Sequence, residues 1–191
     1  MLLHTYPSPE DLLALATATP EYMRPNQIPF AVALEGFLDE DVCDHIREAG
    51  LDLESYTVRD CGAITRECEP IPALEPIEDA ARTLNRIYWE YDLDPGQQSW
   101  LQTYEKGMNY QRHMDGSPGQ MRKLTAVAFV SPETDYDGGD LRLYYHPMSF
   151  DIPRTRGTVV VFQPWIEHEV LPVTGGIRQS INMGFWGPPF K

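Results

Sequence analysis

The sequence predicts a mainly β fold of the α+β class, with helices in the first half and a β-sandwich or barrel in the second half. After residue 98 the chain breaks into about eight short segments rich in β-branched and aromatic residues, which Gly, Pro, Asp and Asn separate. Short strands at near-regular spacing, divided by turn residues, are typical of an all-β sandwich or barrel. Before residue 98, two stretches carry apolar residues at helical spacing instead.

The first part of the chain divides into an arm, a short strand and two helices. Residues 1–30 contain five prolines around a short helical pattern, and are expected to form an arm that packs on the body or stays partly loose. A strand is expected over 30–35. A helix then follows Asp39 as its N-cap, and its apolar stripe ends at Gly50. Residues 56–72 predict a strand with a long loop, and 75–91 a second amphipathic helix.

Charge and composition exclude several classes of partner. The formal net charge is −14, whereas nucleic acids and anionic membranes require a basic surface. No apolar run approaches the ~20 residues of a membrane span, and the first residues lack the basic start and apolar core of a signal peptide. We therefore expect a cytoplasmic protein. Three cysteines, an odd number, predict neither a disulfide framework nor a zinc site.

Two residues of the stretch YQRHMDGS have the spacing of metal ligands. If 109–115 is a strand, His113 and Asp115 project from the same face, because side chains at i and i+2 do so. A third ligand would then come from a distant strand, and His168 follows a buried apolar run at the start of HEVLPV. Two histidines and a carboxylate, with coordination positions left open, are typical of non-haem Fe(II) oxygenases. The alternative is three unrelated polar residues in a β-sandwich.

Arg178 favours the metal-site interpretation. It follows VTGG, which we interpret as a tight turn between antiparallel strands over 168–173 and 177–186, so that it returns to the His168 end. A guanidinium inside a barrel requires an anion, and a carboxylate held in bidentate fashion is its natural partner. Ser180, two residues on, would point the same way and could donate a second hydrogen bond. A solvent-facing arginine on an edge strand is the alternative.

These motifs together resemble a known family. The combination Y-x-x-G-x-x-Y-x-x-H-x-D, then Y-D-G-G-D-L, then H-x-V-x-P-V-T-x-G-x-R is similar to the 2-oxoglutarate- and Fe(II)-dependent dioxygenases of the prolyl 4-hydroxylase-like branch, including small bacterial and phage-type hydroxylases. The resemblance covers roughly residues 77–187. It implies a double-stranded β-helix of the jelly-roll or cupin kind over about 98–187. It also implies a single domain over 31–191, with Fe(II), 2-oxoglutarate and O₂ as cofactors.

The resemblance also implies roles for individual residues. His113, Asp115 and His168 match the iron ligands, and Arg178 matches the anchor of the distal carboxylate of 2-oxoglutarate. The co-substrate pocket would further include Tyr104 and Thr125, and Arg122 would lie at the substrate entrance. Apart from the resemblance, Ser180 is expected in the co-substrate pocket by its spacing, and Tyr110 and Trp186 are expected at the substrate site, with core packing as the alternative for both aromatic residues. Many relatives have tyrosine where this chain has Phe129. Since phenylalanine donates no hydrogen bond, Arg178 and Ser180 would have to supply more of the hold on the co-substrate.

The function implied is hydroxylation of an unactivated C–H bond, with succinate and CO₂ as co-products. The resemblance favours a prolyl residue in a peptide or protein, and the acidic composition would suit a basic partner. One alternative is a hydroxylase of free amino acids or other small molecules. Two others are a non-catalytic β-sandwich binding module and a zinc cupin-like enzyme that uses the same triad.

Overall fold

The computed structural model describes residues 16–17, 28–51, 53–57, 64–68, 72–116 and 121–189. The helical elements are α2 (Glu40–Leu51), η1 (Pro72–Leu74), α3 (Glu75–Leu84), the π-helical turn η2 (Asn85–Trp89) and η3 (Glu133–Asp135). The strands are β1 (Ala16–Thr17), β2 (Ala31–Leu34), β3 (Ser55–Thr57), β4 (Ile64–Cys68), β5 (Gln97–Glu105), β6 (Tyr110–His113), β7 (Arg122–Phe129), β8 (Tyr136–Gly138), β9 (Leu141–Tyr145), β10 (Met148–Asp151), β11 (Val159–Phe162), β12 (Glu167–Val170) and β13 (Val173–Trp186).

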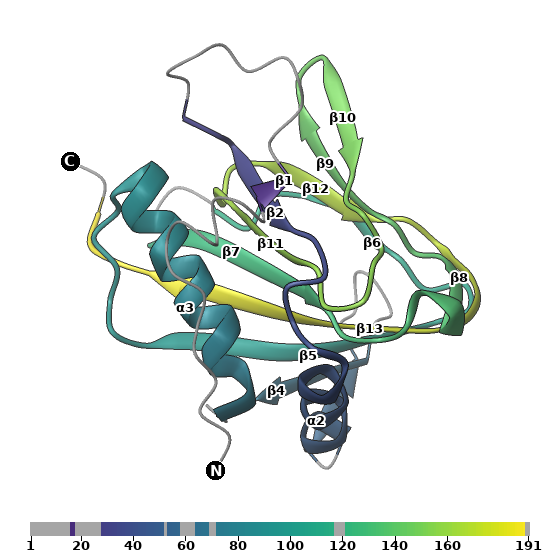
Figure 1. Cartoon of the computed structure of the whole chain (residues 1–191). Helices are drawn as coiled ribbons and strands as arrows, with labels where there is room; N and C mark the ends of the chain where they lie inside the picture. The colour runs from purple at the N-terminus through teal and green to yellow at the C-terminus, as the bar shows by residue number, and fades with distance from the viewer. Residues whose placement is uncertain are drawn as a thin grey trace.

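The strands form two facing sheets. The major sheet runs β1-β2-β11-β7-β13-β5-β4-β3, with β8 paired to one end of β13, and the minor sheet runs β10-β9-β12-β6. All of the pairings are antiparallel. In Figure 1 the long β5, β7 and β13 form the floor, and the β9–β10 hairpin projects away from it. This curled, mainly β architecture confirms the fold class that the sequence predicts.

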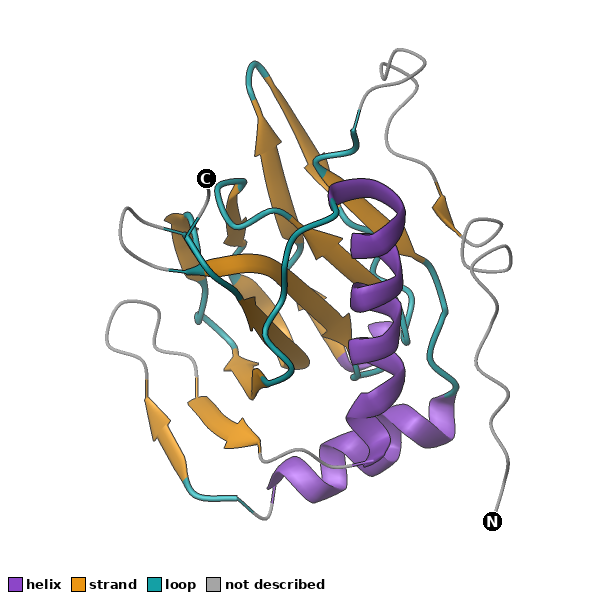
Figure 2. Ribbon diagram, turned by 90° about the vertical axis from the view of Figure 1, so that its left-hand side faces the viewer, coloured by secondary structure: helices purple, strands orange, loops and turns teal. Residues whose placement is uncertain are grey.

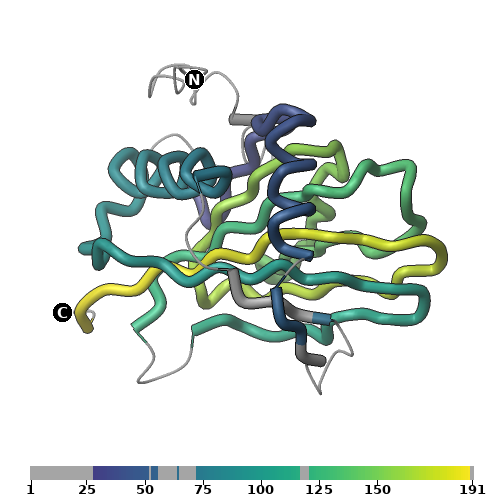
Figure 3. The backbone as a smooth tube through the Cα atoms, turned by 90° about the horizontal axis from the view of Figure 1, so that it is seen from below, coloured from purple at the N-terminus to yellow at the C-terminus, as the bar shows by residue number. Residues whose placement is uncertain are grey.

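The two α-helices cover the outer face of the major sheet, and Figures 2 and 3 show both helices on that one side. Helix α3 buries the apolar positions that the sequence predicts, including Ile77, Ala81 and Leu84. In α2, a Cβ at Gly50 would lie 2.6 Å from a methyl carbon of Leu101. The glycine therefore lets this helix approach β5 more closely than any other residue would allow.

Alternation along the central strands separates two cores. Met183, Ile181 and their neighbours on β7 and β11 pack beneath the helices. The intervening residues face the minor sheet, where Val127, Phe129 and Phe162 form an inner core with Leu143 of β9. Because strand residues alternate between faces, the polar residues of β13 that lie two apart all project into the space between the sheets.

Several predicted boundaries are corrected. The segments 168–173 and 177–186 do not form a hairpin, because Val173–Trp186 is one 14-residue strand in the other sheet. The glycines of VTGG lie inside that strand, and a Cβ at Gly176 would overlap the backbone oxygen of Asp135 in the segment alongside it. They permit a close approach of two segments and do not reverse the chain. Strand β6 ends at His113, so Asp115 lies beyond it.

The predicted helix over 75–91 consists of α3 followed by the π-helical turn η2. The strand predicted over 30–35 is β2, and the helix that follows Asp39 ends at Leu51, one residue after Gly50. Most of the arm over 1–30 and the side chains of Cys61 and Cys68 lie outside the described residues. The division into an arm and one domain over 31–191 therefore stays a prediction. No helix in the described ranges has the length and apolar character needed to cross a membrane.

Candidate metal and anion site

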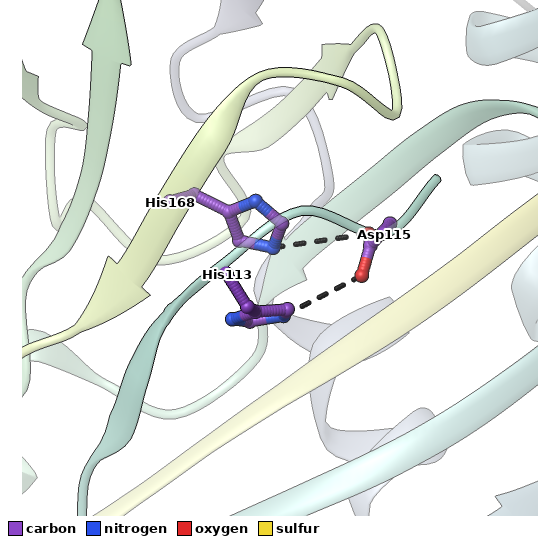
Figure 4. A group of neighbouring side chains, drawn as sticks. All are labelled: His113, Asp115 and His168. Carbon is purple, nitrogen blue, oxygen red and sulfur yellow. Dashed lines mark ion pairs between the residues drawn. The ribbon is translucent and has the colours of Figure 1, made fainter. Parts of the chain in front are cut away.

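Three potential ligands converge between the sheets. His113 at the end of β6 is the direct register partner of His168 in β12, so the two imidazoles lie side by side with ring centroids 4.3 Å apart. Asp115 lies in the bend after β6. The ligand atoms of all three residues lie within 4.8 Å of one another, and Figure 4 shows the side chains pointing toward a common point. The carboxylate lies 3.5 Å from His113 Nε2 and 3.8 Å from His168 Nε2.

Backbone carbonyls orient both imidazoles. His113 Nδ1 lies 2.7 Å from the carbonyl oxygen of Gln111, and His168 Nδ1 lies 2.9 Å from that of Ile166. These contacts place the proton on Nδ1, so that each Nε2 turns its lone pair toward Asp115. Metal-bound histidines in proteins almost always have such a partner on the second nitrogen. The arrangement is that of a preorganised metal site.

The protonation states suit a divalent cation. Burial would raise the pKa of Asp115, but the contact with His113, the positive charge of Arg122, the neighbouring His168 and the Thr125 hydroxyl outweigh burial and hold that pKa well below its usual range. Burial lowers the pKa of His168, against the opposing effect of Asp115, and so favours the neutral imidazole. An ionised carboxylate and neutral imidazoles are the forms that bind metals.

Two further groups hold the Asp115 carboxylate. The Thr125 hydroxyl on β7 donates to Oδ2 at 2.5 Å, and Arg122 Nη2 lies 3.3 Å from the same oxygen. Thr125, which the resemblance assigns to the co-substrate pocket, therefore contacts a metal ligand instead. Arg122 also donates to Asn182 Oδ1 at 2.8 Å. Its Nε is buried, with no hydrogen-bond partner in the part of the chain that the structure describes.

Arg178 lies at the other end of the same cavity. Its side chain is fully buried beside the rings of Tyr104 and Phe129, with its central carbon 5.2 and 5.3 Å from their centroids. Nη1 donates to Ser180 Oγ at 2.8 Å. Among the described residues, Arg178 forms no ion pair with a carboxylate. Burial lowers the pKa of Arg178, yet guanidinium stays protonated in proteins, so this charge calls for an external anion.

A cavity of about 190 Å³ joins the triad to Arg178. Cross-strand register explains its floor, since Tyr104, Gln102 and Trp100 of β5 stand directly opposite Arg178, Ser180 and Asn182 of β13. Tyr110, predicted at the substrate site, also lines the cavity and stacks on His113 at 4.2 Å.

Trp186 does not line the cavity, although it was predicted at the substrate site. It packs behind the cavity against Trp100 and Arg122. Sequence reasoning missed Trp100, Gln102 and Asn182. Their even spacing along the same strands, two or four residues from Tyr104 or Ser180, was the signal that could have found them.

The two histidines and one carboxylate fit a divalent iron of the facial-triad class, and Arg178 lines the same cavity. The fold and site together thus define a double-stranded β-helix with a non-haem metal centre and an anion pocket.

Comparisons with known proteins specify the class further. Residues 99–186 match the model of the 2OG-Fe(II) oxygenase superfamily. A PKHD-type hydroxylase of Cupriavidus pinatubonensis is 34% identical over 91 residues, which are 44% of this chain and 39% of that protein. One of Paracoccus denitrificans is 35% identical over 85 residues, 39% of this chain and 37% of that protein. The matches thus span about two fifths of the length of these relatives.

Solved structures agree on the fold. A prolyl-4-hydroxylase of Pseudomonas putida superposes with a TM-score of 0.72 at 22% identity, covering 84% of this chain and 94% of that one. A viral collagen prolyl hydroxylase from Paramecium Bursaria Chlorella virus-1, in a 2OG complex, gives 0.66 at 19% identity, covering 84% and 97%. Residues 99–186 are therefore similar in sequence to the 2OG-Fe(II) oxygenase superfamily, and the chain has the fold of the prolyl hydroxylases. The superfamily assigns Fe(II), 2-oxoglutarate and O₂ as cofactors.

Proposed function

We propose that this protein is an Fe(II)- and 2-oxoglutarate-dependent dioxygenase that hydroxylates a prolyl residue in a peptide or protein, with succinate and CO₂ as co-products. One observation carries the proposal. A facial triad and a fully buried arginine without a carboxylate partner among the described residues share one cavity. A binding module would have no need of both, and a zinc hydrolase would have no use for the buried guanidinium.

In this proposal His113, Asp115 and His168 would hold Fe(II), and the cavity beside them would take the co-substrate and O₂. When bound, the iron would supply the activation of O₂ and the oxidative decarboxylation of 2-oxoglutarate that drive hydroxylation. The chain supplies geometry. Carbonyl oxygens of the backbone fix both imidazoles, and Thr125 and Arg122 fix the carboxylate.

Arg178 would bind the distal carboxylate of 2-oxoglutarate. Ser180 Oγ already accepts from Arg178, so its hydroxyl proton is available to the same carboxylate. Tyr104 lies over the guanidinium and closes that end. The apolar side chains of Val127, Leu141 and Val170 line the walls between the two ends and exclude water, which strengthens the ion pair.

A peptide substrate is supported by Arg122. Its buried Nε has no acceptor among the described residues, and leaving such a donor unpaired costs about 1–3 kcal/mol. A carbonyl oxygen of the substrate backbone would satisfy it beside the triad. The relatives named above are hydroxylases, and one similar structure, from Trichoplax adhaerens, is a prolyl hydroxylase in complex with a hypoxia-inducible-factor peptide fragment. The net charge of −14 would favour a basic partner.

The first test is an anaerobic titration of the apo-protein with Fe(II) and then 2-oxoglutarate, following the visible metal-to-ligand charge-transfer band. We expect a band that is lost in His168→Ala and weakened in Arg178→Ala. If the wild-type protein binds Fe(II) but shows no band, the assignment of 2-oxoglutarate is wrong.

The second candidate function is hydroxylation of a free amino acid, which the modest cavity of about 190 Å³ favours. After Fe(II) and 2-oxoglutarate are bound, little more than one side chain fits in that volume, and either substrate could present one. Hydroxyproline formation should be measured with proline-containing basic peptides and with free L-proline. Product from the peptides alone supports the first function, whereas product from free proline alone supports the second.

A further inference from the structure

We propose that Gln163 is a positioning residue for the metal ligands, and that its hydrogen bond to Tyr91 fixes the loop that holds Asp115 and His168 in register. The inference rests on the proposed metal site and extends it to residues that touch neither metal nor co-substrate.

Residues 163–166 connect β11 of the major sheet to β12 of the minor sheet, and a hydrogen bond from Ile166 N to Gln163 O closes the turn at 3.0 Å. Two of its carbonyl groups serve the metal ligands. Pro164 O accepts from Gly116 N at 2.9 Å, directly after Asp115, and Ile166 O is the partner of His168 Nδ1. One four-residue loop therefore orients two ligands that are distant in sequence.

The contact with the Asp115 segment is close. A Cβ at Gly116 would lie 3.1 Å from Cβ of Pro164, which leaves almost no room between the two segments. A movement of the loop is therefore passed directly to the chain that carries Asp115, since packed segments transmit displacement. The same movement would shift Ile166 O relative to the imidazole of His168.

Gln163 anchors this loop from outside the site. Its backbone N–H donates to Phe30 O at 3.2 Å, and its side-chain Nε2 donates to the Tyr91 hydroxyl at 2.6 Å. The Tyr91 ring also meets the neighbouring Trp165 edge-on, with centroids 6.1 Å apart. The loop is thus held by the segment before β2 and by the segment that follows η2.

The residue before Tyr91 has an unusual backbone conformation, and Asn85 holds Tyr91 on both sides of its own backbone. Asn85 donates from Nδ2 to Tyr91 O at 2.9 Å and accepts from Tyr91 N at 3.0 Å. The intervening Glu90 has φ 51°, which is left-handed and strained for a residue other than glycine. Such strain persists where the surroundings impose it, and here the buried Asn85 imposes it. The result is a continuous hydrogen-bonded path from the π-helical turn to the metal ligands.

The test uses Co(II) as the probe and the full chain, with the variants Gln163→Met, Tyr91→Phe and the double variant. The first two variants keep the side-chain size and remove the hydrogen bond. Tyr144→Phe is the matched control, because it removes a hydrogen-bonded hydroxyl from the outer face of the minor sheet. Co(II) affinity and the visible ligand-field spectrum are measured with the thermal midpoint of each variant.

We expect each single variant to weaken Co(II) binding about tenfold and to alter the spectrum, because outer-shell partners typically contribute 10–100-fold to metal affinity. The double variant should equal the singles, since both remove one bond. Gln163→Glu, whose carboxylate can accept from the Tyr91 hydroxyl, should recover part of the affinity. The control should bind Co(II) as the wild type does.

The proposal would be overturned if both single variants kept the Co(II) affinity and the spectrum of the wild type. A fall in their thermal midpoints alone would show that the hydrogen bond stabilises the fold without positioning the metal ligands. Fully additive losses in the double variant would also contradict the proposal. The proposed function fails differently. In that case the wild type would bind Co(II) no better than His168→Ala does, and the positioning role would fall with it.

Discussion

The two ends of the cavity are built in different ways. At the anion end, Arg178, Ser180 and Tyr104 lie within β13 and β5, where nine consecutive cross-strand pairs fix the register. At the metal end, His113 closes a short strand, Asp115 lies in a bend, and a loop supplies a carbonyl to His168. The anion end is set by a continuous ladder, whereas the metal end depends on hydrogen bonds between separate segments. Substitutions of residues outside the cavity should therefore lower the affinity for metal more than the affinity for 2-oxoglutarate.

The largest effect should follow removal of a ligand at the metal end. His168→Ala should weaken Fe(II) or Co(II) binding by more than about 100-fold, since outer-shell partners alone contribute 10–100-fold. Isothermal titration calorimetry under anaerobic conditions measures this. His45→Ala, which changes an exposed histidine on α2, is the control and should bind as the wild type does. Equal affinities in the two variants would contradict the metal site.

At the anion end, Arg178→Met should separate binding from stability. Affinity for 2-oxoglutarate should fall by about 100-fold to 1,000-fold or more, because breaking a buried ion pair costs about 3–5 kcal/mol. The apo-protein should become more stable toward urea by about 1 kcal/mol or more, because a buried charge without a carboxylate partner among the described residues is replaced by an apolar side chain. Metal affinity should be unchanged. If Arg178→Met lost affinity for metal but kept its affinity for 2-oxoglutarate, the assignment of the two ends of the cavity would be wrong.

A smaller effect is expected where β7 touches the metal end. Thr125→Val keeps the side-chain shape and removes the hydroxyl that donates to Asp115. The loss of one hydrogen bond to a buried carboxylate costs about 1–3 kcal/mol, so Co(II) affinity should fall about tenfold. Thr125→Ser keeps the hydroxyl and should bind close to wild type. If serine and valine behave alike, the hydroxyl plays no part.

The smallest effect should arise outside the cavity, in the outer core. Burial raises the pKa of Cys43 to about 11, with Arg156 partly opposing. Below pH 9 the thiol is protonated in both states and contributes nothing. Above pH 9 the unfolded thiol ionises while the folded one does not, so the free energy of unfolding falls as pH rises, by about 1 kcal/mol at pH 10. Urea unfolding at pH 8 and pH 10 should show this loss in the wild type, and Cys43→Ala should lack this contribution. Equal losses of unfolding free energy in the wild type and in Cys43→Ala would contradict the role of this thiol.

Prediction from the sequence succeeded where the repeat of apolar and polar residues along one strand or helix determines which face is buried. The alternation of β13 places Arg178 and Ser180 on one face, as predicted, and the apolar period of α3 determines which side it buries. The fold class followed from such local patterns. The hairpin predicted around VTGG was wrong because glycine marks a tight approach of segments as readily as a turn, and only the tertiary structure distinguishes the two.

The contacts between segments were beyond reach of local patterns. Thr125 was placed in the co-substrate pocket, yet its hydroxyl donates to Asp115, a partner ten residues earlier in the bend after β6. Gln163 carries no motif, and its partner Tyr91 lies 72 residues away. Hydrogen bonds of this kind depend on how two sheets and a helix end meet, which hydrophobic periodicity does not encode.

The position of β13 also determines when the site can form during synthesis. This strand lies between β5 and β7 in the sheet but follows both in the chain. While the ribosome is still translating the chain between β7 and β13, the edges of β5 and β7 that will pair with β13 have no partner strand. Such edges are prone to wrong pairing. Arg178 emerges only with the strand that joins them. The nascent chain can therefore acquire neither a closed sheet nor a complete anion pocket until residues 173–186 have left the exit tunnel.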